Sequence, residues 1–445
     1  MRRLTKIICC IVLFVVVTCK SDIDPVDVDP MTDGTPRLRS IVFPGIPEND
    51  VDIDQKNFLV KVKVPPLLPD DMVPEINLTD NAALRGGMEF ILENYSRGLG
   101  FFLDDSVMLN LVLKIPPPKF ADKVTTYFFR PLPSGPLLFS PLPDRFEHVL
   151  NNDETGYIWL AVENLYGNKM PNAIELVNQI TGKTIVQTGW MVKGYRNKSE
   201  VNKLGIDLDP IQDLVPGTYD LTILSGDNER IAVQQPLVVK MGAAWIYYPR
   251  IYFGYEVTPG INLALVGNNL FKGHISLELV NENNKVIQLT DLVFAENGHA
   301  LSIPIPRQLA EGQYILRLIQ DQIKSDLCYR VNVFKSEQKP SYIGTIGDEI
   351  LPCSLTEPVD VARGVDIFFT FYPSVPGVAR LRMVSVATGS IYHGAVTPYS
   401  GGIPPKLVIA DQVPAGLYVA SLEILGEKGQ ILGTSRPYAR KVLVK

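Results

Sequence analysis

The chain contains 445 residues, and at roughly 150 residues per domain this length indicates several domains and excludes one compact core. Hydrophobic residues make up 46% and charged residues 20% of the sequence, which excludes a disordered protein because so much apolar surface offsets the entropy of the unfolded chain. The 35 prolines and 34 glycines, beside many β-branched and aromatic residues, favour short strands joined by turns and predict an all-β fold.

An export leader opens the chain. Basic residues precede a 12-residue apolar run from Ile7 to Thr18, as in a signal peptide, and the run is too short to span a bilayer. It ends in Val16-Val17-Thr18-Cys19, which resembles a bacterial lipobox and implies that residues 1–18 are removed and that Cys19 is acylated. Thr18 departs from the usual Gly, Ala or Ser, so an ordinary signal peptide cut near residue 20 stays an alternative.

Residues 19–35 form an acidic, proline-punctuated stretch without helical or strand periodicity, which predicts a flexible tether. Cys19 followed by Lys20, Ser21 and Asp22 resembles the export signal of Bacteroidota surface lipoproteins. The resemblance implies an outer-membrane protein that faces the cell exterior and is held by its acyl chains, such as palmitate, alone. Losing the three positive charges of the leader takes the formal net charge from −6 to −9. Nucleic acid is therefore a poor partner, because its binding depends on Lys and Arg.

Two cysteines lie beyond the leader and Cys19, at Cys328 and Cys353. Because their separation spans a predicted domain junction, a disulfide that staples two domains is one interpretation in an oxidising compartment. Two unpaired thiols are the other. We favour the unpaired thiols, because nothing in the spacing requires a bridge and connectivity cannot be read from sequence.

Three segments share one pattern, in which a glycine stands two residues before a tyrosine that opens an alternating strand. The tyrosines are Tyr219, Tyr314 and Tyr418, 95 and 104 residues apart. Each resembles the tyrosine corner of immunoglobulin-like sandwiches, in which the hydroxyl bonds to backbone while the ring packs. Periods near 100 residues indicate tandem sandwiches rather than a solenoid of short repeats.

Residues 242–337, which contain Tyr314, carry a further resemblance. Pro259-Gly260 and the run from Leu265 to Phe271 resemble the opening of an IPT/TIG domain, an immunoglobulin-like fold whose second strand ends in a Gly-x-Asn-Phe-like turn. An extra Leu270 precedes Phe271, and the paired glycines usual before that strand are absent. The resemblance supports the fold more than any activity.

The N-terminal unit is less regular, but residues 57–64 read as a strand and end in a run, Val60 to Val64, that alternates between apolar and charged residues. It resembles the small immunoglobulin-like module that follows the tether in Bacteroidota surface lipoproteins. The proline-rich residues 130–136 predict a stiff linker after it. The sequence therefore predicts an elongated array of immunoglobulin-like β-sandwich domains, at residues 36–136, 137–241, 242–337 (IPT/TIG-like) and 338–445.

Motifs for catalysis or metal binding are absent from the sequence. The four histidines have no second His, Cys or carboxylate at metal-ligand spacing, and no nucleophile elbow, phosphate loop or dinucleotide fingerprint occurs. We therefore expect no enzyme, no cofactor and no metal. Paired glycosidase acids leave no local trace in a sequence, so a hydrolase stays a third hypothesis.

Aromatic residues are the remaining functional signal. The unit at residues 137–241 holds about seven more residues before its corner tyrosine than the unit at residues 242–337 does. The glycine-bracketed segment in this interval contains Trp190, Tyr195 and Arg196. The rings could stack on sugar faces while the arginine takes hydroxyl groups, and the alternative is that Trp190 fills the sandwich core. Tyr392 and Tyr399 form a second tentative loop site in the fourth unit. The aromatic cluster at residues 245–255 is interpreted as packing at a domain junction.

The whole pattern resembles the surface glycan-binding lipoproteins that accompany starch-utilisation-type outer-membrane transporters. That resemblance implies a protein that binds polysaccharide or oligosaccharide without cleaving it and presents it to an outer-membrane uptake complex. The alternative is a protein-binding adhesin or a non-catalytic structural subunit of an outer-membrane complex. A flat aromatic platform with a polar rim would favour the glycan, and a long apolar patch would favour a protein.

Overall fold

A computed structural model provides the structure of the chain. The predicted leader, Cys19 and nearly all of the predicted tether lie outside the residues that it describes. The structure describes residues 31, 33–69, 72–88, 100–102, 107–114, 124–151, 157–166, 171–189, 191–193, 201–226, 229–247, 254–335, 341–347, 353–372, 378–397 and 405–445.

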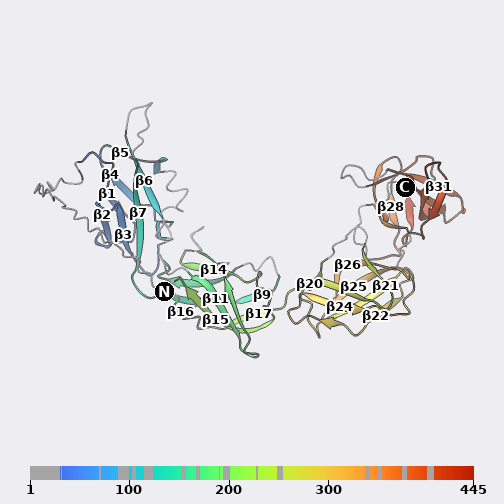
Figure 1. Cartoon of the computed structure of the whole chain (residues 1–445), viewed down its shortest axis with the longest axis horizontal. Coiled ribbons are helices and arrows are strands. Elements are labelled where there is room, and N and C mark those ends of the chain that lie inside the picture. Colours follow the sequence, from blue (N-terminus) through green and yellow to red (C-terminus); the bar gives the residue numbers. More distant parts are fainter. Residues whose placement is uncertain are drawn as a thin grey trace, which may run out of the picture.

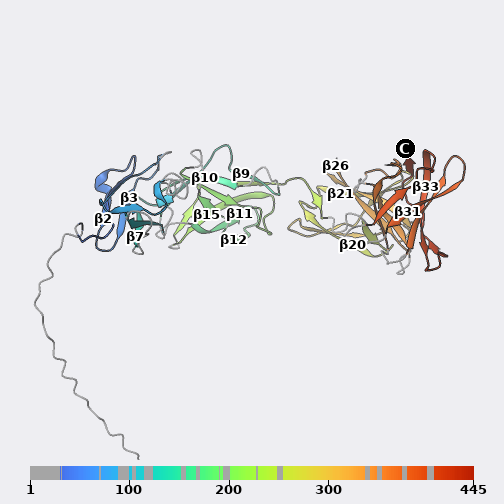
Figure 2. The same ribbon diagram turned by 90° about the horizontal axis from the view of Figure 1, so that it is seen from above.

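The described residues form 35 strands and the short 3-10 helix η2, which confirms the predicted all-β fold. The strands fall into four groups in chain order, β1–β7, β8–β17, β18–β26 and β27–β35, which we call the N-terminal, second, third and fourth units. Figure 2 shows the units along one line, and Figure 1 shows the first and the last turned to the same side of the middle two. The predicted boundaries fall between these groups and, as limits of independently folding domains, stay predictions.

The N-terminal unit packs a two-stranded ladder, β1-β4, and a five-stranded sheet, β2-β3-β7-β6-β5, around one core. Alternation along β3 places Val60, Val62 and Val64 in that core, as the pattern of residues 57–64 predicted. The elements are β1 (Leu38–Val42), η2 (Glu48–Asp50), β2 (Val51–Asp54), β3 (Leu59–Val64), β4 (Glu75–Leu78), β5 (Ala82–Leu84), β6 (Met108–Leu113) and β7 (Val124–Pro133).

The second unit is a two-layer sandwich with a core of its own. The smaller sheet has the order β13-β14-β10-β8, and the larger has the order β12-β11-β15-β17-β9 with β16 paired to β15. The strands are β8 (Leu138–Pro141), β9 (Glu147–Val149), β10 (Tyr157–Glu163), β11 (Pro171–Asn178), β12 (Thr184–Thr188), β13 (Met191–Lys193), β14 (Lys203–Asp207), β15 (Gly217–Ser225), β16 (Arg230–Ala232) and β17 (Leu237–Lys240).

The third unit repeats the sandwich. Its smaller sheet, β18-β20-β24-β23, and its larger sheet, β19-β26-β25-β21-β22, enclose a separate core. The strands are β18 (Trp245–Ile246), β19 (Tyr255–Val257), β20 (Asn262–Asn268), β21 (Ile275–Asn281), β22 (Val286–Leu289), β23 (Val293–Phe294), β24 (Ala300–Pro304), β25 (Gly312–Gln320) and β26 (Ile323–Val333).

The fourth unit joins its two layers into one continuous ladder of order β27-β29-β32-β31-β30-β33-β35-β28, with β34 paired to β33. The pairing of β31 with β32 makes the connection, so the layers wrap around the core instead of remaining separate sheets. The strands are β27 (Tyr342–Ile346), β28 (Val359–Val361), β29 (Asp366–Tyr372), β30 (Val378–Ser385), β31 (Ile391–Thr397), β32 (Lys406–Ile409), β33 (Gly416–Leu425), β34 (Ile431–Thr434) and β35 (Val442–Val444).

The three corner tyrosines make the contact that their resemblance implied. The hydroxyl of Tyr219 donates to the carbonyl of Val215 at 2.8 Å, and those of Tyr314 and Tyr418 donate to the carbonyls four residues upstream at 2.9 and 2.7 Å. All three rings are buried. Each tyrosine thus ties the turn before its strand to the core of its own unit.

The joint between the N-terminal and second units is shared core. Tyr166 and Val201 belong to the second unit's part of the chain, yet both are buried in the core cluster of the N-terminal unit. Asn202 adds a two-way contact to Leu68, since its amide accepts from the Leu68 N–H at 2.7 Å and donates to the Leu68 carbonyl at 2.8 Å. Apolar packing and paired hydrogen bonds therefore hold these units together.

The joint between the second and third units is built from the IPT/TIG-like turn. Asn269 donates from Nδ2 to the carbonyl of Leu150 in the second unit and to that of Ala243, both at 3.0 Å. Phe271 packs against the core cluster of the second unit. Gly242 lies so close to Leu150 that an added Cβ would stand 2.1 Å from its carbonyl oxygen. The residues that suggested the fold therefore also connect two units.

A disulfide connects the third and fourth units. Cys328 on β26 is bonded to Cys353, with a Cα–Cα distance of 5.1 Å. The favoured expectation of two unpaired thiols was wrong, because folding brings β26 beside the segment that precedes β28. The spacing of the two cysteines in the sequence does not reveal that they lie close together in the fold.

A buried histidine predicts a pH dependence. His148 on β9 is fully buried, with Nε2 3.1 Å from Oδ1 of Asp209, and burial lowers the pKa of His148 from its ordinary value of 6.5. Below about pH 6.5 the unfolded chain takes up a proton on this histidine more readily than the folded chain does. The free energy of unfolding should therefore fall as the pH is lowered, by up to about 1.4 kcal/mol per pH unit.

Thermal unfolding at several pH values checks this expectation. In the variant His148→Gln the slope between pH 6.5 and 5 should flatten, because the titrating group is gone. An unchanged slope would assign the pH dependence to other groups.

Candidate functional site

Four of the five residues predicted to bind ligand, Trp190, Tyr195, Arg196 and Tyr399, lie outside the described residues. Tyr392 is described. It lies on β31, is half-buried and meets the ring of Tyr418 edge-on, with centroids 5.8 Å apart and planes at 88°. Tyr392 thus packs against the core of the fourth unit. Its predicted companion Tyr399 lies outside the described residues, so the tentative loop site stays a prediction.

The aromatic segment of the second unit runs into a sheet that the structure does describe. Strand β13 begins one residue after Trp190 and pairs with β14, and β14 pairs with β10. Trp159 lies on β10 of this smaller sheet, and Trp190, which is outside the described residues, directly precedes β13 in the sequence. The outer face of the sheet is the candidate site.

Strand β10 places two aromatic rings on that outer face. Its buried residues Ile158, Leu160 and Val162 point into the core, and the alternate positions Tyr157 and Trp159 point away from it. The two ring centroids are 6.0 Å apart, with the planes inclined at 54°. Tyr157 is 38% exposed and Trp159 is half-buried, so both rings stand at the surface on a rigid strand.

Small and polar residues surround the rings. Gly205 on β14 pairs with Trp159 and brings no side chain, which leaves the indole beside bare backbone. Asp207 pairs with Tyr157 in the same ladder, and Ser140 on β8 pairs with Ala161. An exposed ring face attracts apolar C–H surface, while carboxylate and hydroxyl groups take hydroxyl partners. The face carries the two kinds of group that recognition of a sugar needs.

Tyr157 and Trp159 are not among the site residues predicted from the sequence. Period-two alternation could have found them. If Ile158, Leu160 and Val162 face the core, residues 157 and 159 must face out.

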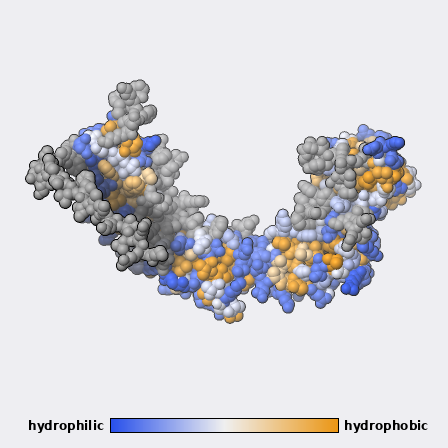
Figure 3. All heavy atoms as spheres, viewed as in Figure 1, coloured by the Kyte–Doolittle hydropathy of each residue, from blue (hydrophilic) through white to orange (hydrophobic). Residues whose placement is uncertain are grey.

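The smaller sheet of the third unit presents a different surface, which we call the apolar face. Val266 on β20 and Val293 on β23 are 60% and 64% exposed, and Tyr247, directly after β18, is 56% exposed. The outward positions of β20, β23 and β24 carry no charged residue in the part of the chain described here. Figure 3 shows hydrophobic atoms gathered on the third unit, where Figure 1 labels β20 and β24.

A cavity of about 730 Å³ lies at the junction of the second and third units. Phe271, Phe294, Leu292 and Met241 supply apolar parts of its wall, and Lys272 lies among its polar residues. Its volume is in the range of small-molecule sites, and Lys272, His274 and Glu296 are the titratable residues of its lining.

Among the residues that the structure describes, no group of three or more His, Cys, Asp or Glu side chains is placed to hold a metal ion. No helix within this described part of the chain is long and apolar enough to cross a membrane.

Comparison with known proteins establishes neither a family nor a function for the chain. No family model and no curated protein matches the chain. Among solved structures, SGBP-B of the Bacteroides ovatus mixed-linkage glucan utilization locus, in complex with a mixed-linkage heptasaccharide, is 15% identical with a TM-score of 0.18. That match covers 67% of this chain and 65% of the other, less than two thirds of its length.

Extracellular domains 3–5 of Drosophila OTK are 11% identical with a TM-score of 0.25 over 71% of this chain and 99% of the other. Titin domains I67–I69 are 10% identical with a TM-score of 0.16 over 69% and 96%. Such low scores carry no argument about activity. The fold is that of tandem immunoglobulin-like domains, which the strand order and the corner tyrosines establish in the structure itself.

Proposed function

We propose that the chain is a surface lipoprotein that binds polysaccharide without cleaving it and presents it to an outer-membrane uptake system. The observation that carries this proposal is the pair of outward rings, Tyr157 and Trp159, 6.0 Å apart on one strand. A ring on a strand is held by the ladder on both sides, so little conformational entropy is lost when a sugar stacks on it.

The polar neighbours of the rings support the same function. Asp207 and Ser140 flank the aromatic pair in the ladder and can bond to sugar hydroxyls. The predicted segment with Trp190, Tyr195 and Arg196 joins the same sheet through β13. We propose that it extends this platform at the sheet edge.

Replacing Trp159 by alanine tests the proposal. We expect Trp159→Ala to abolish the retardation of the full chain in a gel that contains a polysaccharide recognised by the wild type. Because the indole is only half-buried, the melting temperature should change little. A core tryptophan would instead cost about 3–5 kcal/mol on truncation.

Tyr247→Ala is the matched control, since it removes an exposed ring from the third unit and should leave retardation unchanged. Full retardation of Trp159→Ala would contradict a site on the second unit. A large loss of stability in Trp159→Ala would assign the indole to packing.

The membrane anchor is part of the proposal. If Cys19 carries the acyl chains, Cys19→Ala should move the protein from the detergent phase to the aqueous phase in a partition assay, because the anchor is the main hydrophobic attachment. Wild-type protein treated in parallel is the control. Retention of the variant in the detergent phase would contradict the lipoprotein assignment.

The apolar face supports protein binding as a second candidate function. Uncharged, highly exposed apolar surface is typical of protein interaction sites, and the outward side chain of Val266 is 60% exposed there. In the gel assay Val266→Lys should leave polysaccharide binding intact. Loss of binding in Val266→Lys, with retention in Trp159→Ala, would move the ligand site to the third unit.

A further inference from the structure

The fourth unit covers the outer face of the larger sheet of the third unit. A strand with one face in solvent alternates between buried and exposed residues, but the last six residues of β26, Cys328 to Val333, are all buried. Their outward members include Arg330 and Asn332, 1% and 0% exposed. Arg330 donates from Nη1 to the hydroxyl of Thr345 on β27 at 3.2 Å. The fourth unit therefore supplies the second cover of this strand.

Polar contacts hold one end of this interface. Arg436 of the fourth unit donates from Nη2 to Oδ1 of Asn332 at 3.3 Å, and its guanidinium lies 4.9 Å from the ring centre of Phe334. Gln313 on β25 accepts from the N–H of Ala439 at 3.3 Å. Burial of Arg436 lowers its pKa, yet a guanidinium stays charged, so hydrogen bonds and the ring must compensate its desolvation.

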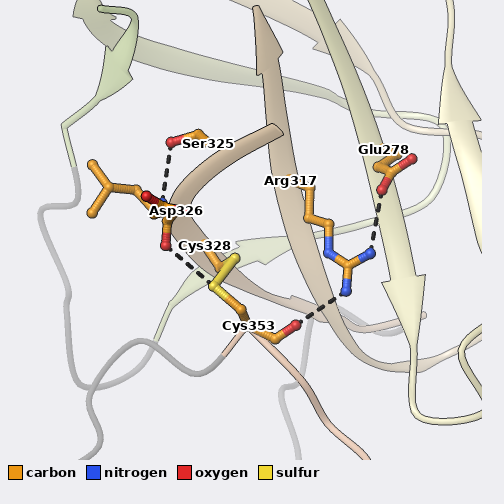
Figure 4. The surroundings of a disulfide bond; sticks show 7 residues. Glu278, Arg317, Ser325, Asp326, Cys328 and Cys353 are labelled. Carbon is orange, nitrogen blue, oxygen red and sulfur yellow. Dashed lines mark hydrogen bonds and ion pairs between the residues drawn. A yellow bond between two sulfur atoms is a disulfide. The ribbon is translucent and has the colours of Figure 1, made fainter. Parts of the chain in front are cut away.

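The disulfide holds the other end. Figure 4 shows Cys328 and Cys353 joined beside Arg317, whose Nη2 donates to the Cys353 carbonyl at 3.2 Å. Leu355, two residues after Cys353, packs against Val280 in a small apolar cluster with Cys328. Gln313 and Arg317 are four residues apart on one strand, so the two ends of the interface are separated by roughly 13 Å.

We propose that the Cys328–Cys353 disulfide is a redox-sensitive clamp that fixes the orientation of the fourth unit on the third. One attachment point leaves two bodies free to rotate about it, and a second point at a distance removes that freedom. The contacts of Arg436 hold one end, the covalent bond holds the other, and the bond from Arg330 to Thr345 lies between them. Opening the disulfide leaves the orientation of the fourth unit to non-covalent contacts alone.

The two sulfurs differ in access, which sets the order of reduction by a dithiol. Cys353 is exposed, whereas Cys328 is 3% exposed. A thiolate of the dithiol attacks Sγ of Cys353, the bond between the two cysteines breaks, and Cys328 leaves as a thiolate. The second thiol of the reagent then displaces Cys353. Two electrons and two protons pass to the protein, which holds two thiols, and the reagent leaves as a cyclic disulfide.

The test uses the full chain in small-angle scattering and in calorimetry, with and without a dithiol. We expect oxidised wild type to show a narrow distribution of dimensions and one joint unfolding transition for the third and fourth units. Reduction should broaden the distribution and split that transition in two, while the β-type circular dichroism spectrum is retained.

Cys353→Ser is the matched variant, because it removes the exposed sulfur and leaves the buried one. It should behave like the reduced wild type, and a dithiol should change it no further. Identical scattering and one joint transition in wild type before and after reduction would overturn the clamp. Loss of the β spectrum on reduction would also overturn it, since the bond would then be needed for folding itself.

Discussion

Replacing Tyr127 by alanine is expected to lower the free energy of unfolding of the N-terminal unit by about 3–5 kcal/mol. Tyr127 on β7 is fully buried and meets the ring of Phe58 edge-on at 5.4 Å. Its hydroxyl donates to Oε1 of Gln55 at 2.6 Å and accepts from the N–H of Leu38 at 3.3 Å. The variant leaves a cavity and two polar groups without their partner, and both effects destabilise the fold.

Tyr127→Phe separates the two effects. It keeps the ring and removes the hydroxyl, so we expect a loss of about 1 kcal/mol, the usual net worth of a hydrogen bond. Chemical denaturation followed by fluorescence measures both variants against the wild type. Equal losses for alanine and phenylalanine would show that the hydrogen bonds, and not the packing, determine stability at this position.

The second large effect is expected at Gly242, in the joint between the second and third units. An alanine Cβ there would lie 2.1 Å from the carbonyl oxygen of Leu150 and 3.0 Å from Nδ2 of Asn269. Backbone cannot yield as a flexible side chain does, so Gly242→Ala should force the units apart. We expect the free energy of unfolding to fall by about 3 kcal/mol, the upper range for overpacking. In calorimetry, the first unfolding transition should move to a lower temperature.

Gly433→Ala is the control, because it adds the same methyl group where nothing lies within 4 Å. It should change the unfolding temperature little. If the first unfolding transition of Gly242→Ala stays at the wild-type temperature, the two units already move apart freely.

The sequence predicted most of the fold because strand patterns are local. Alternation marks one face of a strand as core, and a glycine before a tyrosine marks the corner in three units. The candidate site follows less directly from local composition. Composition marks the segment around Trp190, which stays a prediction, whereas Trp159 is found only from the alternation of β10, which turns it away from the buried Ile158 and Leu160.

Contacts between units could not be predicted from local patterns. The end of β26 reads Cys328-Tyr329-Arg330-Val331-Asn332-Val333, and alternating polar residues in such a strand indicate a solvent-facing side. The structure buries Arg330 and Asn332 because another unit covers that side. The disulfide was undecidable for the same reason, since the distance between Cys328 and Cys353 is created by packing between units.

The shared joints fix the order of the units along the chain. Tyr166 and Val201 complete the interior of the unit that precedes them, and the half-buried Phe271 packs against the core of the second unit. Each of these two units therefore depends on its successor to complete or cover its interior. Exchanging or deleting one unit would leave a hole in its predecessor and uncover an apolar side chain, so recombination could shuffle these modules only as linked pairs.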